Sequence, residues 1–402
     1  MTNRPRARAG TPRWQAATEI EEALLEAVRN KDRRGYLRIL ATADLFHYVP
    51  KDYQDKRGGR AYFPTEDVDG SVCVVVRTVG ERLPRRAQFV AVRTSLLELE
   101  AIWPGSRYTL HVNPGTPAFM RLTASALDRR RWRKTAAEAT ASLPTDTRPT
   151  RLLTKYTGPR TGPLAHALAC GAHLSVANGV LWNEIGDVYD SYGNEVKTLR
   201  EWWGTTTAHE WQEQLDALLE GRNSPPEPQF ALDVRQQLAL EMEGRGDGRV
   251  DTGLWRRTCT AVLADLQAPA EVEETVQELI GRILRYEARF RADGLLPPDG
   301  FVRSAVGYDY GRAVGFARWG LSARLCPFAA AEEAVLRAGE LCHEAYRSWE
   351  DFSAGYALGR VLRFDTEEFG QWYTKVLEPH RILTKDAESP WRTIPWNSTS
   401  TV

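Results

Sequence analysis

The apolar residues of this 402-residue chain change their spacing about a third of the way along its length. Before that point they gather in short runs rich in β-branched and aromatic residues, each bounded by glycine or proline, which is the pattern of β-strands. These runs cover residues 44–50, 71–79, 87–95 and 107–112. Beyond about residue 165 the apolar residues recur every three or four positions, as in amphipathic helices. The sequence therefore predicts an α+β domain, with a small sheet and flanking helices, followed by an all-α domain.

Helical segments flank the predicted strands of the first domain. Residues 18–40 have a helical period, and Thr18 and Glu21 stand at the spacing of a capping box. The stretch GERLPRR is rich in turn-forming residues, so we expect the second and third strands to form a hairpin. Residues 95–103 fit one short helix before the last strand.

A region without apolar periodicity separates the two domains. Residues 143–165 are rich in proline, threonine and glycine, and they are predicted to be a linker. The α+β domain then covers residues 15–142, and the all-α domain covers residues 166–396. Within the all-α domain, Thr207 and Glu210 have the spacing of a helix-capping box.

Charge and composition argue against several classes of protein. The chain carries 53 basic and 53 acidic residues, so it lacks the basic excess of a dedicated nucleic-acid binder. No run of about eighteen apolar residues occurs, which argues against a membrane span. Residues 1–14 are basic and have no apolar segment behind them, and we expect a disordered tail there rather than a secretory signal. The five cysteines are scattered, as in reduced cytoplasmic proteins, and a cytoplasmic location is expected.

Templates for catalysis and metal binding are not matched. His209 and Glu210 begin the zinc-protease pattern H-E-x-x-H, but the last position is Glu213. The glycine-rich stretch 244–253 lacks the lysine of a phosphate loop and predicts an ordinary loop. The basic stretch RRRWRK, residues 129–134, is compatible with a nucleic-acid contact, but the neutral total charge favours a solvated arginine face. We therefore predict no metal ion and no cofactor.

The stretch GYDYGRAVGFARWG, residues 307–320, places charges among glycines and aromatic residues on a predicted helix. Asp309 and Arg312 are three positions apart, so they meet on the helix surface. Gly311 and Gly315 form a smooth stripe that another helix can approach closely. Because each glycine costs about 1 kcal/mol relative to alanine in a helix interior, close helix packing is the expected compensation.

The predicted partner helix lies in YRSWEDFSAGYALGR, residues 346–360. Ser348 is placed as the N-cap, with Asp351 three residues later. One stripe of this helix, at steps of three and four residues, consists of Tyr346, Trp349, Ser353, Tyr356 and Arg360. Gly355 and Gly359 clear a groove beside the stripe. We expect the two glycine-notched helices to bring their polar groups together.

Two interpretations of these polar groups are open. In the first, an Asp–Arg–Tyr network fixes how the helices dock. In the second, the arginines line a pocket for a small anionic ligand, because arginine forks suit phosphate oxygens. Asp309, as a base, and Tyr356 are then the catalytic candidates. The substrate-binding candidates are Arg312, Arg318, Arg360, Tyr346 and Trp349.

The first half of the chain resembles the SseB N-terminal domain family of bacteria over residues 32–125. The resemblance lies in LFHYVP, VAVRTSLLEL and WPGSRYTLHVNPGTP. Arg93 departs from the aromatic residue that is more usual before Thr94 and Ser95. The family is named from a serine-sensitivity phenotype, and the resemblance implies no established reaction.

The second half is similar to the YbeU/YbeR-type bacterial domain of unknown function (domain of unknown function 1266) over residues 175–396. The matching stretches are YDYGRAVGFARWG and YRSWEDFSAGYALGR, with EWWGTTTAHEWQEQLDALLEG as a weaker match. Tyr308 stands where a tryptophan is more familiar. The resemblance implies a helical domain whose signature positions are Asp309, Arg312, Arg318, Tyr346, Trp349, Tyr356, Gly359 and Arg360. It implies no catalytic assignment.

These observations favour a cytoplasmic bacterial interaction or scaffold protein that binds a protein partner through both domains. The support is the lack of a catalytic template and the joining of two unlike modules, since a fold by itself does not define a function. The alternative is an effector or toxin-type enzyme, or its immunity-type partner, that acts on a phosphate-bearing substrate through the Asp/Arg/Tyr residues. Whether the chain is an enzyme is left open by the sequence.

Overall fold

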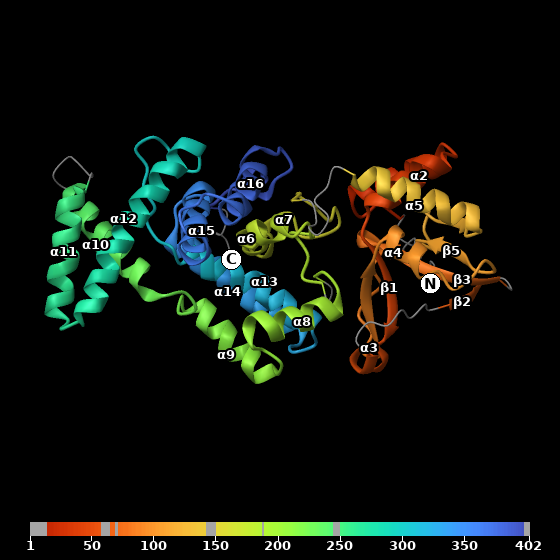
Figure 1. The fold of residues 1–402 in the computed structure, drawn as a ribbon, viewed down its shortest axis with the longest axis horizontal. Coiled ribbons are helices and arrows are strands. Elements are labelled where there is room, and N and C mark those ends of the chain that lie inside the picture. The colour runs from red at the N-terminus through yellow and green to blue at the C-terminus, as the bar shows by residue number, and fades with distance from the viewer. Residues whose placement is uncertain are drawn as a thin grey trace, which may run out of the picture. The chain divides into compact units, whose positions relative to one another are not determined.

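The structure of the protein is a computed structural model, and it describes residues 14–57, 65–68, 71–141, 150–186, 189–243 and 250–397. Its contacts divide the chain into two compact units, Met1–Pro144 and Thr145–Val402. The first unit contains a sheet and the second is helical (Figure 1), so the predicted fold class is confirmed. The basic tail predicted for residues 1–14 lies outside the described residues except for Trp14.

The first unit alternates strands with short helices. Its elements are α1 (Glu19–Arg29), α2 (Arg33–Thr42), β1 (Leu45–Pro50), α3 (Lys51–Arg57), β2 (Thr65–Val68), β3 (Ser71–Thr78), the 3₁₀ turn η1 (Val79–Glu81), β4 (Phe89–Thr94), α4 (Leu96–Ala101), β5 (Thr109–Val112), β6 (Met120–Thr123) and α5 (Ala126–Thr140). The predicted strands correspond to β1, β3, β4 and β5. Strands β2 and β6 were not predicted, because each has only four residues and a mixed polar pattern.

The strands that the structure describes form one sheet in the order β4-β1-β3-β5-β6, with β2 paired to β3 beside this path. Strands β3 and β5 are parallel, and the other neighbours are antiparallel. The predicted hairpin is wrong, because β1 lies between β3 and β4. It pairs with β4 from Leu45, opposite Thr94, to Pro50, opposite Phe89. Leu45 and its neighbour Phe46 point to opposite faces and are both buried, which explains the inner position of β1.

Helix α1 is tied to the sheet through a buried carboxylate. The Thr18 side chain caps the helix by accepting a hydrogen bond from the Ile20 amide at 3.2 Å. Glu21 accepts from the Thr78 hydroxyl and, at 3.0 Å, from the Gly80 amide. Glu21 therefore joins α1 to the end of β3 instead of completing the capping box that its spacing predicts.

The basic stretch 129–134 lies on α5, and its tryptophan faces inward. Trp132 is buried and meets Trp103 edge to face, with ring centroids 5.3 Å apart. The Arg133 guanidinium pairs with Glu100 of α4. Because the indole is covered, it offers no platform on which a nucleic-acid base could stack.

The second unit consists of helices. Its elements are α6 (Gly162–Cys170), α7 (Ala172–Ala177), α8 (Tyr192–Trp203), α9 (Ala208–Leu219), α10 (Pro226–Glu243), α11 (Thr252–Asp265), α12 (Ala270–Asp293), α13 (Gly307–Ser322), α14 (Phe328–Ala345), α15 (Trp349–Phe364), α16 (Gln371–Lys385) and α17 (Pro390–Thr393). Two predicted caps are confirmed. Thr207 and Glu210 form a capping box at the start of α9, and Ser348 accepts from the Asp351 amide at 3.2 Å. None of the helices in the described ranges is long and apolar enough to cross a membrane.

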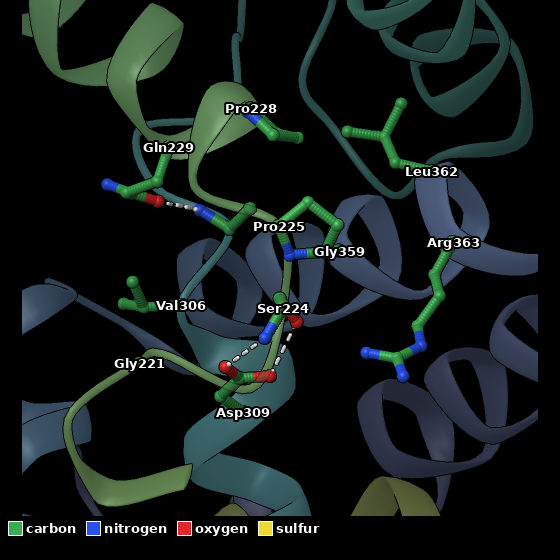
Figure 2. Close-up of a pocket in the computed structure, with 11 residues that line it drawn as sticks. Gly221, Ser224, Pro225, Pro228, Gln229, Val306, Asp309, Gly359, Leu362 and Arg363 are labelled. Atoms are coloured by element: carbon green, nitrogen blue, oxygen red, sulfur yellow. Dashed lines mark hydrogen bonds between the residues drawn. The ribbon is translucent and has the colours of Figure 1, made fainter. Parts of the chain in front are cut away.

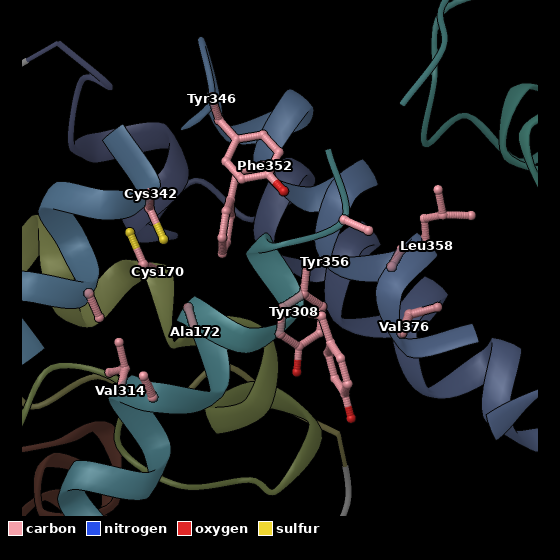
Figure 3. Packing of buried hydrophobic residues seen from close by; sticks show 14 of the residues in the cluster. Cys170, Ala172, Tyr308, Val314, Cys342, Tyr346, Phe352, Tyr356, Leu358 and Val376 are labelled. Carbon is pink, nitrogen blue, oxygen red and sulfur yellow. The ribbon is translucent and has the colours of Figure 1, made fainter. Parts of the chain in front are cut away.

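Helix α13 runs through the middle of the helical unit. All its residues are buried except Tyr310 and Trp319, which are partly exposed. Helices α6, α7, α8, α9, α14 and α15 pack around it. Figure 3 shows Tyr308 and Val314 of α13 among buried side chains of the neighbouring helices. A charged residue on α13 is therefore inside the core and needs a partner.

Glycines let α13 and α15 touch, as the sequence predicted. A Cβ atom on Gly311 would lie 2.9 Å from the ring of Tyr356, and one on Gly359 would lie 2.6 Å from the Cβ of Tyr308. Gly315 is not part of this contact, because it faces α7. The glycine-notched contact between the two helices thus rests on one glycine from each.

Part of the predicted linker lies against the helical unit. The side-chain amide of Asn183 accepts a hydrogen bond from the backbone amide of Lys155 and donates one to its carbonyl, each at 2.8 Å. Residues 142–149 lie outside the described residues. The described part, residues 150–161, thus belongs to the helical unit.

Tryptophans that follow α16 fasten the end of the helical unit to its beginning. Trp391 in α17 donates from Nε1 to the carbonyl of Ala169 at 3.0 Å, across 222 positions of sequence. Its ring stacks on Trp349, with centroids 5.7 Å apart. Trp396 donates to the carbonyl of Tyr346 at 3.1 Å. The core around α6 and α15 is therefore completed by residues 390–396.

Candidate functional site

Asp309 lies in the first turn of α13 and is surrounded by donors, of which Figure 2 shows Ser224. Its Oδ2 accepts from the backbone amides of Asn223 at 3.1 Å and Ser224 at 2.9 Å. Its Oδ1 accepts from the Ser224 hydroxyl at 2.6 Å and from the Arg312 guanidinium. The side chain is 1% exposed. The carboxylate thus holds a loop that precedes α10 and is matched in charge by Arg312.

The Arg312 side chain also contacts a backbone carbonyl and two aromatic rings. Its Nε donates to the carbonyl of Tyr308 at 3.3 Å, and its guanidinium carbon lies 4.0 Å from the Tyr308 ring centroid. The ring of Trp203 lies 5.3 Å away. With Asp309 as its ion partner, Arg312 has the surroundings of a structural residue.

Arg318 is bound at a different place, two turns further along α13. It donates to the Ser175 hydroxyl at 3.1 Å and to the Leu181 carbonyl at 2.7 Å. Its guanidinium carbon lies 4.5 Å from the ring centroid of Tyr189. Arg318 joins α13 to the segment around α7, and its partners are separate from those of Arg312.

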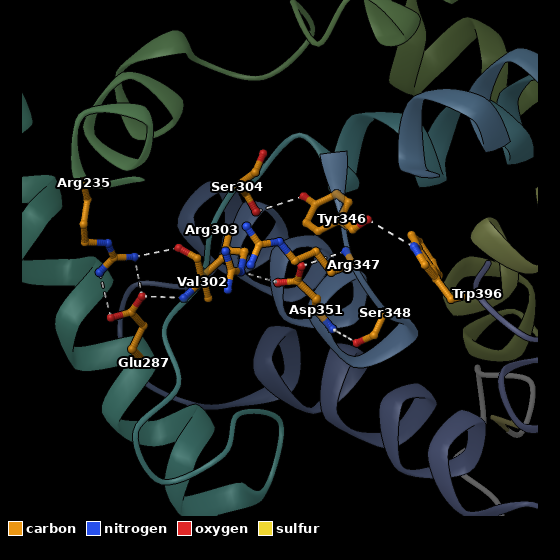
Figure 4. Close-up of polar contacts among 10 residues, drawn as sticks. All are labelled: Arg235, Glu287, Val302, Arg303, Ser304, Tyr346, Arg347, Ser348, Asp351 and Trp396. Atoms are coloured by element: carbon orange, nitrogen blue, oxygen red, sulfur yellow. Dashed lines mark hydrogen bonds and ion pairs between the residues drawn. The ribbon is translucent and has the colours of Figure 1, made fainter. Parts of the chain in front are cut away.

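Tyr346, drawn in Figure 4, and Trp349 also have structural partners. The Tyr346 hydroxyl donates to the Ser304 carbonyl at 2.9 Å and accepts from the Gly307 amide at 2.8 Å. Burial raises the pKa of Tyr346. Trp349 donates to the carbonyl of Ile394 at 2.8 Å. Both residues hold loops against the start of α13 and α15.

Tyr356 stands at one end of a polar chain that crosses the core. Its ring stacks on His173, with centroids 4.4 Å apart. His173 Nε2 lies 2.9 Å from the Ser353 hydroxyl, which lies 2.8 Å from Nδ1 of His380. Burial lowers the pKa of His380 to about 4, lowers that of His173 well below 6.5, and raises that of Tyr356 to about 12. All of these groups are neutral at pH 7.

Arg360 differs from the other two arginines because, among the described residues, no carboxylate or backbone carbonyl binds its guanidinium, whose polar neighbour is the Tyr356 hydroxyl. Its guanidinium carbon lies 5.8 Å from the ring centroid of Trp372 in α16 and 5.9 Å from that of Phe364. The Nε atom is buried and makes no hydrogen bond. The three arginines that the sequence singled out therefore do not share one anion pocket.

A cavity opens to solvent beside Asp309, and the space within it, solvent at its mouth included, is about 450 Å³. It is lined by Gly221, Ser224, Pro225, Pro228, Gln229, Ala305, Val306, Asp309, Gly359, Leu362 and Arg363. Most of these residues present carbon atoms, and the charges come from Asp309 and Arg363. Arg363 is exposed and donates to the carbonyl of Asn223 at 3.0 Å. No ion pair joins it to a carboxylate within the described parts of the chain.

A second, more polar cavity of about 700 Å³ lies between α10 and α12. Its charged core is the buried pair of Arg235 and Glu287, joined by two hydrogen bonds of 3.1 and 2.6 Å. Arg235 also donates to the carbonyl of Val302 at 2.7 Å (Figure 4). Trp255 and Phe301 contribute rings around its guanidinium. Arg235 and Glu287 therefore form a buried ion pair, as Asp309 and Arg312 do.

The site combines predicted residues with others that sequence reasoning missed. Asp309 and Arg312 meet as their spacing indicates, but their donors at Asn223 and Ser224 come from a loop more than eighty positions away. The turn-forming run NSPPEP around that loop was the available signal. In the described part of the chain, no three His, Cys, Asp or Glu side chains could hold a metal ion together.

These features define a helical domain with closed ion pairs and one largely apolar cavity, and they do not define a reaction. Residues 198–396 match the model of a family described as "Protein of unknown function (DUF1266)". The match begins inside α8 and takes in both glycine-notched helices, so the helical unit is similar to this family over most of its length. The comparisons with curated proteins and with solved structures found no match.

Proposed function

We propose that the helical unit is a docking module that holds a segment of a partner protein in the cavity beside Asp309. The observation that carries this proposal is the cavity itself, which has largely apolar walls and an exposed arginine, Arg363, at its edge. Concave apolar sites with a few placed polar groups are the usual form of binding sites, and arginine is enriched among the residues that dominate interfaces. A segment with an apolar side chain next to a carboxylate fits both features.

The charges inside the unit support docking over catalysis. Asp309, the candidate base, already accepts hydrogen bonds from four donors. Tyr356 has a pKa of about 12 because it is buried, so its hydroxyl stays protonated at neutral pH. The alternative of an effector or toxin-type enzyme, or its immunity-type partner, with a phosphate-bearing substrate has less support from these two residues.

The proposal extends to the whole chain as a cytoplasmic bacterial scaffold. On the sequence resemblance described above, we assign residues 32–125 to an SseB-like domain that supplies a second binding surface. The sheet of the first unit is compatible with that assignment. Two unlike modules in one chain suit a protein that brings two partners together.

Photo-crosslinking tests the cavity directly. We expect a photoreactive amino acid at the exposed position of Pro225, at the cavity wall, to capture a partner protein in cells that express the full chain. Arg363→Glu should reduce that adduct at least tenfold, because it places a negative charge opposite the partner's carboxylate. The matched control is Arg257→Glu on α11, an exposed arginine that does not line the cavity.

Two results would contradict the docking proposal. One is an adduct that is equally strong in the Arg363→Glu and Arg257→Glu proteins. The other is the lack of any adduct from Pro225 in cells where a second reporter position, Val306, also captures nothing. Thermal melts of both charge-reversal variants should match that of the unmodified protein, since surface substitutions usually change stability little.

A further inference from the structure

A cluster of positive charge lies where α15 ends and α16 begins, outside the docking cavity. Its centre is Trp372, whose ring centroid lies 5.8 Å from the guanidinium carbon of Arg360 and 4.8 Å from Nζ of Lys375. Phe364 stacks on Trp372, with centroids 5.0 Å apart. All four side chains are partly exposed, so the cluster reaches solvent.

Two of the acidic residues that are close in sequence have other partners, and the exposed Glu368 and Glu378 form no ion pair with the cluster within the described residues. Asp365 accepts from the Tyr286 hydroxyl at 2.7 Å, and Glu367 pairs with Arg285. The first turn of α16 carries no acidic residue. Within the ranges that the structure describes, neither cation of the cluster takes part in an ion pair. No carboxylate among the described residues is therefore paired with the positive charge at this corner.

Holding the two cations together is unfavourable without a further partner. The Nε of Arg360 is a buried donor without an acceptor. Burial, and after it the positive charge of Arg360, lower the pKa of Lys375, as repulsion between two neighbouring cations would. The same charge contributes to the lowered pKa of His173, after burial and the neighbouring His380. An anion that contacts the exposed side of both cations would cancel the repulsion.

We propose that Arg360 and Lys375 form a binding site for a phosphate group beside Trp372 and Phe364. A guanidinium presents donors in a planar fork that matches two oxygens of phosphate, and an ammonium group adds a compact charge for a third. The aromatic rings hold the cations through cation–π contacts and leave their N–H groups available to a ligand. Two positive charges match a phosphate monoester, which carries between one and two negative charges at neutral pH. None of these four side chains lines the docking cavity, although Arg363 at the edge of that cavity also lies 5.7 Å from the Phe364 ring centroid.

Calorimetric titration of the full chain tests the site with two probes, inorganic phosphate and phenyl phosphate, at constant ionic strength in sodium chloride. We expect saturable binding of at least one probe, and at least tenfold weaker binding after Arg360→Met or Lys375→Gln. Lys385→Gln, which changes an exposed lysine in the last turn of the same helix, should bind as the unmodified chain does. Tighter binding of phenyl phosphate would identify an ester as the ligand, and tighter binding of inorganic phosphate would identify the free anion.

The proposal fails if neither probe binds saturably to the unmodified chain, or if Arg360→Met and Lys375→Gln leave binding unchanged. An adduct from Pro225 could persist in either case, so this failure is distinguishable from failure of the docking proposal. If Arg360→Met does not fold, Lys375→Gln alone decides, because Lys375 is partly exposed and its removal relieves a repulsion. Thermal melts show which variants are folded.

Discussion

The arginines on helix α13 have polar partners within the protein, whereas the cations at the corner between α15 and α16 have no carboxylate partner among the described residues. On α13, Arg312 pairs with Asp309, and Arg318 donates to the Ser175 hydroxyl and a backbone carbonyl. At the corner, Arg360 and its neighbouring lysine lie against aromatic rings and have no carboxylate partner among the described residues. A buried charge that is matched by the protein maintains the fold, whereas an unmatched cation near the surface points to a ligand.

The largest expected effect is a difference in the free energy of unfolding between a substitution on α13 and one at the corner. Arg312→Met should reduce the free energy of unfolding by about 3–5 kcal/mol, because it leaves the Asp309 carboxylate buried without its counter-charge. Arg360→Met should change it by less than about 1 kcal/mol, because the thioether side chain still packs on Trp372. Urea unfolding followed by tryptophan fluorescence measures both values. If the two substitutions cost the same, the distinction between matched and unmatched charges is wrong.

Lowering the pH should destabilise the core beside α15, because His380 and His173 are buried there in their neutral form. The pKa of His380 is about 4 in the folded protein and near 6.5 in an unfolded chain. Between these pH values the unfolded chain binds a proton that the folded protein excludes, so the free energy of unfolding falls as pH falls from 6.5 towards 4. The loss attributable to His380 is about 3 kcal/mol once pH 4 is reached. His173, whose pKa is also lowered by burial, adds a loss of the same sign.

The variant His380→Gln isolates this effect from other titrating groups, because it removes the proton-binding site and retains a polar side chain. Its free energy of unfolding should depend less on pH between 6.5 and 4 than that of the unmodified protein. Urea unfolding at several pH values gives the two slopes. Equal slopes would show that His380 does not bind the proton that destabilises the fold.

The smallest effect concerns the glycines at the contact of α13 with its neighbours. A Cβ on Gly311 would lie 2.9 Å from the Tyr356 ring and 3.1 Å from the Cys170 carbonyl, whereas one on Gly315 would meet the flexible end of Leu174. Gly311→Ala should therefore cost about 1–3 kcal/mol. Gly315→Ala should stay within about 1 kcal/mol of the unmodified protein, because the gain in helix propensity offsets the crowding. Thermal melts that rank the two variants the other way would contradict this assignment.

Local features of the fold were predictable because their causes lie within a few residues. The caps at Thr207 and Ser348 follow from side chains that reach amides three positions away. The contact of Asp309 with Arg312 follows from helical spacing in the same way. The change of apolar period also placed the sheet and the helical unit in the correct order.

Long-range pairings could not be predicted, because the relevant partners are far apart in sequence. Nothing near Asp309 indicates that Ser224 will supply two of its donors. The inner position of β1 depends on pairing with a strand more than forty residues later, and turn residues suggested a hairpin instead. The stripe that carries Arg360 was recognised, but its neighbour Trp372 lies on the next helix, and the angle between helices is not encoded in a local pattern.

The bond from Trp391 to Ala169 has a consequence for how the chain is made. The ribosome adds Ala169, which supplies the acceptor, 222 residues before it adds Trp391, which supplies the donor. At about 5–20 residues per second, α6 waits roughly 10–45 s before this partner exists. During that interval the apolar face of α6 and the ring of His173 lack the indole that later covers them. Until translation has passed residue 396, α6 therefore lacks side chains that cover it in the folded unit.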